Sequence, residues 1–258
     1  MIKSSLSLFS VGLAALILLS ACATEPTSER VYDAPMNTGI LVVGGTGQLG
    51  SYQVNQLSAA GERVIVLARS TSSFERIKDS TYEVVIADLT DADAVMAAVA
   101  EAKPAVIIDA SNLPGIRMDD GDSFYWRSMR TLTTAAKATG VSQIIRHSAR
   151  GARAMLTSPP SEGMTSEPRI INYMRDVARA EMALEQSGVP YTIVLNSSLP
   201  PEPAAATGRG ALLDDLSADG GITRSDLARI TNPCILNTDC YDKTFNGIDA
   251  DLPPPVFN

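Results

Sequence analysis

A glycine-rich turn between an apolar run and a helical stretch constrains the fold of this chain most strongly. Residues 40–50 read Ile-Leu-Val-Val-Gly-Gly-Thr-Gly-Gln-Leu-Gly, so the glycines begin where the apolar run ends. Two spacings are met together, Gly45-x-Gly47-x-x-Gly50 and Gly44-x-x-Gly47-x-x-Gly50. Glycines at such positions permit a tight turn, a close approach of backbone to a pyrophosphate, and close packing of helix on strand. The N–H groups that open the helix then favour an anion.

Short apolar runs alternate with helical stretches along the rest of the chain. The expected strands are Ile40–Val43, Val64–Leu67, Val84–Ile86, Val106–Ile108, Gln143–Arg146 and Tyr191–Leu195. The expected helices span 48–60, 72–78, 91–102, 122–139 and 170–187. Mostly continuous apolar runs are typical of parallel strands covered on both faces. The alternation therefore predicts a single α/β domain over residues 39–258, with the doubly wound parallel sheet of a Rossmann fold.

The first 21 residues are predicted to be a targeting segment outside this domain. Lys3 precedes an apolar stretch of signal-peptide length that is too short for a comfortable membrane span. The stretch ends in Leu19-Ser20-Ala21-Cys22, which resembles a bacterial lipobox and implies a lipoprotein signal peptide with acylation of Cys22. Ordinary secretion, with cleavage near Ala21 or Ala23, is the alternative.

Residues 22–38 are predicted to be the lipidated cysteine and a flexible tether. The segment after Cys22 is polar and contains two prolines, and a flexible chain of this length spans roughly 20–24 Å. Several acyl chains anchor a protein more stably than one. Ala23 stands where retention at the inner membrane would require an aspartate. The resemblance thus implies a protein of the bacterial envelope, on the periplasmic face of the outer membrane in a Gram-negative cell.

Composition argues against several functional classes. Removing residues 1–21 takes away only Lys3 among the charged side chains and leaves 20 basic against 29 acidic residues. Because nucleic-acid binding needs a basic face, this balance argues against nucleic acid as a partner. His147 is the single histidine, which excludes an ordinary Ser-His-Asp triad and a multi-histidine metal site, so no metal is expected. Its place at a strand end predicts a packed role in the core.

The second glycine spacing resembles that of the extended and atypical short-chain dehydrogenase/reductases, in particular the NmrA-like NAD(P)-binding proteins. Similar segments follow in the family's order from Ile40 to about Asp249. They are Gly44-Gly45-Thr46-Gly47-Gln48-Leu49-Gly50, Ala87-Asp88-Leu89, Ser187-Gly188-Val189-Pro190-Tyr191-Thr192-Ile193-Val194, Ser225-Asp226-Leu227-Ala228 and Lys243-Thr244-Phe245-Asn246. The resemblance implies a NAD(P) cofactor on the glycine turn, with Asp88 and Leu89 near the adenine and Ala110 as a further contact.

The end of the second expected strand bears on which nucleotide is bound. An acidic residue near this point would hold the ribose 2′-hydroxyl of NAD. This chain has Ala68 followed by Arg69, and a guanidinium can pair with a 2′-phosphate. The sequence therefore favours NADP, with NAD still possible; a solvated surface arginine is the alternative interpretation.

The catalytic machinery that the resemblance implies is incomplete. Catalytic members of the family use Tyr-x-x-x-Lys on the helix after the fifth strand, and the matching positions are Tyr173 and Val177. Valine supplies neither charge nor donor, and Asp176 is expected to share the face of the tyrosine and raise its pKa. Ser148 matches the family's catalytic serine, and a small residue where a strand meets a loop explains it equally well.

The remaining cysteines, Cys234 and Cys240, are separated by five residues. Outside the cytoplasm such a pair is expected to form a disulfide that pins a surface loop, rather than a redox or metal site.

The expected location outside the cytoplasm conflicts with the expected cofactor. A signal without a twin arginine implies export of an unfolded chain, and free NADP is expected to be scarce outside the cytoplasm. Three hypotheses follow. In the first, the chain is a membrane-anchored NAD(P)(H)-binding protein, either a sensor or an oxidoreductase with an altered site. In the second, it is an envelope scaffold on a vestigial Rossmann fold. In the third, it is an active NADPH-dependent reductase of the cytoplasm whose apparent signal is incidental. Site chemistry, not fold, must decide between them.

Overall fold

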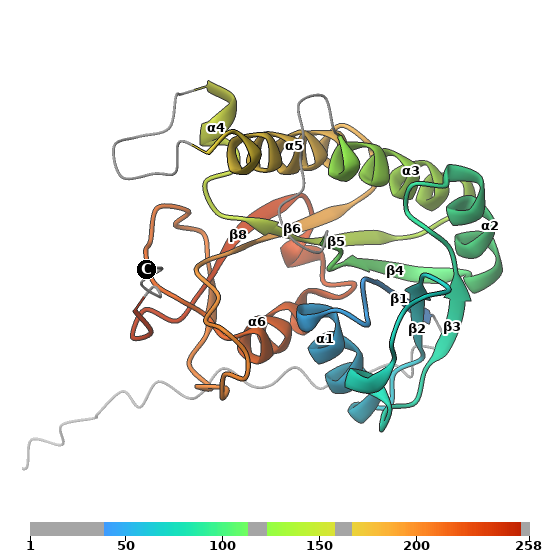
Figure 1. The fold of residues 1–258 in the computed structure, drawn as a ribbon, viewed down its shortest axis with the longest axis horizontal. Helices are drawn as coiled ribbons and strands as arrows, with labels where there is room; N and C mark the ends of the chain where they lie inside the picture. Colours follow the sequence, from blue (N-terminus) through green and yellow to red (C-terminus); the bar gives the residue numbers. More distant parts are fainter. Residues whose placement is uncertain (1–38, 113–122, 158–166, 254–258) are drawn as a thin grey trace, which may run out of the picture. The chain divides into compact units, whose positions relative to one another are not determined.

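The chain folds into a sheet with helices on both faces, as Figure 1 shows. The computed structural model describes residues 39–112, 123–157 and 167–253. The strands are β1 (Gly39–Val43), β2 (Val64–Ala68), β3 (Glu83–Ile86), β4 (Pro104–Asp109), β5 (Gln143–Ala149), β6 (Tyr191–Asn196), β7 (Ala211–Leu213) and β8 (Lys243–Ile248). The helices are α1 (Gln48–Ala59), α2 (Ala92–Ala102), α3 (Phe124–Thr139), α4 (Ala154–Thr157), α5 (Pro168–Glu185) and α6 (Arg224–Thr231). The predicted signal peptide, Cys22 and the tether lie outside the described residues.

The strand order confirms the predicted doubly wound sheet. It runs β3-β2-β1-β4-β5-β6-β8-β7, and every neighbouring pair is parallel except β7 with β8. The chain moves outward from β1 to β3, then crosses back to β4 on the other side of β1. Ligands of such sheets bind where the order reverses, at the carboxyl ends of the strands. That position lies between β1 and β4.

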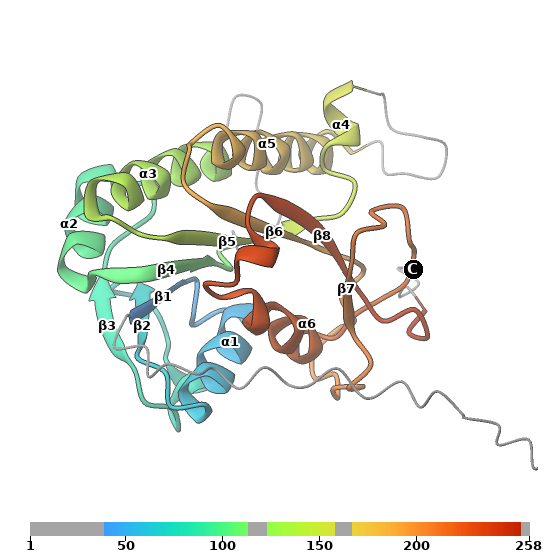
Figure 2. The ribbon, with the colours of Figure 1, turned by 180° about the vertical axis from the view of Figure 1, so that it is seen from behind.

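Two apolar cores lie on opposite faces of this sheet. Helices α2, α3 and α5 cover one face, and α1 and α6 cover the other (Figures 1 and 2). Successive residues of a strand point to opposite faces, so Ile107 of β4 packs in the first core with Met129 and Leu184. Its neighbour Ile108 packs in the second core with Val54. Burial on both faces explains the continuous apolar runs of the inner strands.

Three segments differ from the sequence-based expectation. The helix expected over 72–78 is wrong: only Glu75–Ile77 is helical, as a 3-10 turn. The Ser72 and Ser73 hydroxyls accept hydrogen bonds from nearby backbone N–H groups there, and such bonds compete with an α-helix. Strand β3 is an edge strand, so Val84 and Ile86 are exposed rather than covered on both faces. Strand β7, three residues long, was not predicted and pairs antiparallel with β8.

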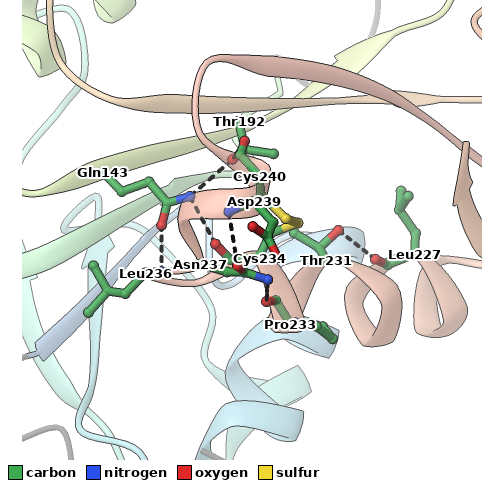
Figure 3. The surroundings of a disulfide bond; sticks show 10 residues. All are labelled: Gln143, Thr192, Leu227, Thr231, Pro233, Cys234, Leu236, Asn237, Asp239 and Cys240. Carbon is green, nitrogen blue, oxygen red and sulfur yellow. Dashed lines mark hydrogen bonds between the residues drawn. A yellow bond between two sulfur atoms is a disulfide. The ribbon is translucent and has the colours of Figure 1, made fainter. Parts of the chain in front are cut away.

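Cys234 and Cys240 form a disulfide, shown in Figure 3. It lies in the apolar core on the α1 side of the sheet. The S–S distance is 2.10 Å, and both cysteines are buried in the core rather than on a surface loop. The Gln143 side-chain amide donates to the Cys234 carbonyl at 2.9 Å and to the Thr192 hydroxyl at 3.0 Å, and its oxygen accepts from the Leu236 N–H at 2.7 Å. The bridged segment is therefore fixed to the sheet by polar contacts as well as by the disulfide.

Candidate nucleotide-binding and catalytic site

The predicted glycine turn lies at the carboxyl end of β1, beside the reversal of strand order. The Gly47 N–H donates to the Gly44 carbonyl at 2.9 Å, which closes the turn. The Ser51 N–H donates to the Gly47 carbonyl at 3.0 Å and starts α1. Gly44 has a φ of +76°, a conformation that side-chain-bearing residues rarely adopt.

Two of the glycines leave no room for a side chain. A Cβ atom at Gly44 would lie 2.8 Å from the Ala110 carbonyl oxygen and from the Ser111 Cα. One at Gly50 would lie 2.2 Å from the Gly44 carbonyl oxygen. The Ala110 N–H donates to the Val43 carbonyl at 3.0 Å, so the end of β4 packs directly on the turn. The structure thus brings Ala110, predicted as a cofactor contact, to the glycine turn.

The first turn of α1 can receive an anion. Gly47 occupies the N-cap position and has no side chain to accept from the N–H groups that follow. Gly47 and Gln48 are exposed, Thr46 and Leu49 are half-buried, and Gly45 is buried against Val54 and Val66. Unpaired N–H groups and the helix dipole favour negative charge at this position.

Arg69 and Asp88 follow the carboxyl ends of β2 and β3, and both are exposed. The Thr90 N–H and hydroxyl donate to one Asp88 oxygen at 2.9 and 2.7 Å. These bonds hold the pKa of Asp88 below its usual value, and the nearby Arg69 cation lowers it further. Arg69 is therefore close enough to Asp88 to interact, and a phosphate at Arg69 would compete with that carboxylate. Leu89, next in the chain, packs against the core.

Ser148 does not present its hydroxyl to the crevice. It lies near the end of β5, is buried, and donates to the Glu181 carboxylate of α5. The other Glu181 oxygen accepts from the Arg153 guanidinium at 2.6 Å. Ser148, Glu181 and Arg153 form a chain of polar contacts that ties β5 to α5.

Tyr173 lies on α5 in contact with a second tyrosine that the sequence analysis did not identify. Its ring packs edge-on against Tyr125 of α3, with centroids 5.5 Å apart. The guanidinium carbon of Arg146 lies 5.8 Å from the centroid of the Tyr125 ring. Burial raises the pKa of Tyr173, and the Arg146 cation acts in the opposite direction. The cation near this tyrosine thus comes from β5 rather than from its own helix.

Arg146 forms a buried ion pair with Asp109, across the carboxyl ends of β5 and β4. One Asp109 oxygen also accepts from the Ser111 N–H at 3.0 Å. The Tyr125 hydroxyl donates to the Asn112 side chain. Sequence reasoning missed this cluster, although a charged residue at the end of each apolar strand was a visible signal. It links the residues behind the glycine turn to Tyr173.

Asp176 does not have the predicted relation to Tyr173. One oxygen accepts the Tyr125 N–H at 2.7 Å, so the carboxylate caps the start of α3. Burial raises the pKa of Asp176, and the N–H groups of Tyr125 and Trp126 act against that rise. The rise in the pKa of Tyr173 comes from burial, not from Asp176. Val177, predicted to stand at the family's lysine position, is in the apolar core.

His147 has the predicted packed role. It is buried on the α1 side of β5, and its Nε2 lies 3.1 Å from the Gln53 side-chain nitrogen. Burial lowers the pKa of His147 to about 4, with Asp109 and Asn196 acting in the opposite direction. The imidazole is therefore neutral at pH 7.

Among the described residues, no group of three or more His, Cys, Asp or Glu side chains could hold a metal ion. Of the helices in that part of the chain, none combines the length and the apolar character of a membrane span.

Residues 44–238 match the model of a protein family described as NAD(P)H-binding. The chain belongs to this NAD(P)H-binding family. A relative, a 3-diazoavenalumate denitrifying reductase from Streptomyces sp, is 31% identical over 116 residues. That match covers 42% of this chain and 37% of the relative, little more than a third of its length.

Solved structures share the fold. ChuY, an anaerobillin reductase from Escherichia coli, superposes with a TM-score of 0.67 at 21% identity and covers 84% of this chain and 100% of its own. A wide-type short-chain dehydrogenase/reductase from Veillonella parvula, solved in complex with NADP, has a TM-score of 0.63 at 14% identity and covers 85% and 99%. The predicted NAD(P)-binding family and the predicted Rossmann-type fold are confirmed, and the assignment of Tyr173 and Val177 to the Tyr-x-x-x-Lys positions stays a prediction.

Proposed function

We propose that this family member binds NADP(H) at the bacterial envelope, where an acylated Cys22 attaches it to a membrane. The observation that carries the nucleotide part is the glycine turn, whose Gly44 and Gly50 leave no space for side chains at the carboxyl end of β1. Exposed Arg69 supports NADP over NAD, because no carboxylate follows β2 to hold a ribose hydroxyl. The lipobox-like Leu19–Cys22 supports the anchor.

The cofactor is tested by isothermal titration with residues 23–258, which contain every described element. We expect tighter binding of NADPH than of NADH, and a loss of about tenfold in NADPH affinity for Arg69→Ala. Arg76→Ala, an exposed cation in the same segment, is the matched control and leaves both affinities unchanged. Equal affinities that Arg69→Ala does not alter would refute the preference for NADP. No binding of either nucleotide would favour the scaffold hypothesis.

The anchor is tested by labelling cells that express the full chain with radioactive palmitate. We expect label on the wild-type protein and none on Cys22→Ala, with the wild type in the membrane fraction. An unlabelled wild-type protein in the cytosol would instead support the cytoplasmic reductase.

A second candidate function is an NADPH-dependent reductase with an altered relay. The specific observation is that Arg146 lies over the Tyr125 ring, which packs edge-on against Tyr173 and so gives that tyrosine a cation nearby despite Val177. The similar proteins named as reductases support the same reaction class. A panel of quinones and aldehydes with NADPH tests it. Turnover that Tyr173→Phe abolishes without weakening NADPH binding would establish this function, and no turnover with any acceptor would leave the binding protein.

A further inference from the structure

Helices α3 and α5 carry a strongly basic surface. Their exposed cationic side chains are Arg127, Arg130 and Lys137 on α3, and Arg169, Arg175 and Arg179 on α5. The two helices pack side by side in one layer on the sheet (Figures 1 and 2). We call these six side chains and the surface they share the basic helix face.

Among the described residues, no carboxylate forms an ion pair with Arg130, Lys137, Arg169 or Arg175, and Arg179 interacts electrostatically with the buried Asp176. Helix α3 contains no acidic residue. On α5, Asp176 and Glu181 are buried and serve the contacts described above, and Glu185 pairs with Arg153 at 2.7 Å. The whole chain nevertheless has a net charge of −8, which is opposite in sign to the exposed charge of these two helices. The overall balance that argued against a phosphate-rich partner therefore does not describe this face.

The spacing puts most of these cations on one stripe of each helix, and Arg169 lies off the stripe of α5 because it precedes Arg175 by six positions. Arg127, Arg130 and Lys137 are three and seven positions apart, and Arg175 and Arg179 are four apart. Residues at such intervals share a helix face. The guanidinium of Arg130 lies 4.8 Å from the centroid of the half-buried Trp126 ring, which adds an amphipathic aromatic to the stripe. Aromatics of this type are enriched at the boundary between water and lipid.

We propose that the basic helix face rests on an anionic phospholipid surface. The proposal builds on the proposed anchor at Cys22. Residues 23–38, fully extended, reach roughly 53–58 Å, and they enter the domain at Gly39, the start of β1. The carboxyl-terminal ends of α3 and α5 lie at that same edge, because the helices run antiparallel to the strands they connect. Anionic headgroups attract Lys and Arg within about a Debye length of the surface.

Charge also argues against two other occupants. A second copy packed symmetrically on this face would oppose like charges across the interface. A nucleic acid would meet the same cations, but an exported, lipid-attached chain reaches headgroups before any other polyanion. Binding to duplex DNA is therefore measured in the test as a competing outcome.

The test is cosedimentation of residues 23–258, which lack an acyl chain, with vesicles at about 0.1 M salt. We expect binding to vesicles that contain phosphatidylglycerol and none to pure phosphatidylcholine. Removal of two cations in Arg130→Gln/Arg179→Gln lowers the partition coefficient about 30-fold, since each cation contributes about fivefold. Lys78→Gln/Lys243→Gln, which removes two exposed cations elsewhere, is the matched control and changes it little. Far-ultraviolet circular dichroism checks that each variant is folded.

Three results would overturn the proposal: no binding to anionic vesicles, equal losses in the two double variants, or tighter binding to duplex DNA than to vesicles. Each is independent of the proposed function, because the assay contains neither an acyl chain nor a nucleotide. A failed palmitate labelling or NADPH titration would therefore leave the vesicle result standing, and the reverse also holds.

Discussion

The glycine turn and the residues around Tyr173 lie at the same edge of the sheet but are built differently. At the turn, backbone atoms from β1, α1 and the end of β4 approach so closely that Gly44 and Gly50 are required. Around Tyr173, side chains determine the arrangement, and Arg146, Asp109 and Ser148 are each bound to another buried group. A binding site built from backbone atoms therefore persists as long as the fold does. A site built from side chains can be replaced by packing contacts while the fold stays the same.

The largest expected effect tests whether the second region is structural. Arg146→Met removes the partner of the buried Asp109 carboxylate, and we expect a loss of about 3–5 kcal/mol in the free energy of unfolding. Urea denaturation at pH 7 measures it. Adding Asp109→Asn should recover a large part of the loss, because no buried charge then remains. A single variant as stable as wild type would contradict this account of the ion pair.

His147 gives a pH-dependent test of how tightly the α1 side of β5 is packed. Its pKa is about 4 when folded against an unfolded value of 6.5, so the unfolded chain binds the proton first. This contribution to stability is fully present above pH 6.5 and is lost as the pH falls toward 4. We expect wild type to lose on the order of 3 kcal/mol more than His147→Gln over that range. If wild type and His147→Gln lost the same free energy of unfolding between pH 6.5 and pH 4, the result would contradict a neutral, buried imidazole.

Gly50→Ala tests the glycine turn itself. The new Cβ would lie 2.2 Å from the Gly44 carbonyl oxygen, so we expect a loss of about 1–3 kcal/mol in stability and a loss of NADPH binding, seen as loss of its fluorescence enhancement. Gly47→Ala is the control for stability alone, because Gly47 belongs to the binding turn but has a φ of −77°, and its Cβ would be 3.1 Å from the nearest atom. Equal losses of stability in the two variants would show that space at Gly50 is not what matters.

Ser148→Ala has the smallest expected effect and separates the two regions most directly. It removes one hydrogen bond to the Glu181 carboxylate, so we expect a loss of about 1–2 kcal/mol in stability. Affinity for NADPH should not change, because the hydroxyl does not face the turn. If any reductase turnover is found, abolition of it by Ser148→Ala in a folded protein would contradict the structural role given to this serine.

The sequence predicted the part of the site that depends on local pattern. The turn at Gly44–Gly50 and the inner parallel strands were expected because glycine spacing and apolar runs are local signals. The contacts of Asp176 with α3 and of Arg146 with Asp109 were missed, since they join residues 51 and 37 positions apart. The basic helix face was missed for another reason: a net charge averages over surfaces that the fold separates.

The surroundings of Val177 show what a lysine at this predicted relay position would meet. Its side chain is 2% exposed and packs in the core between α5 and the sheet. A lysine there would bring an ammonium group into an apolar interior, where it would lose its proton or unfold the helix around it. Asp176, beside it, already holds α3 in place. A lysine at position 177 would therefore be accommodated only if the contacts of α5 with α3 and with the sheet were rebuilt as well.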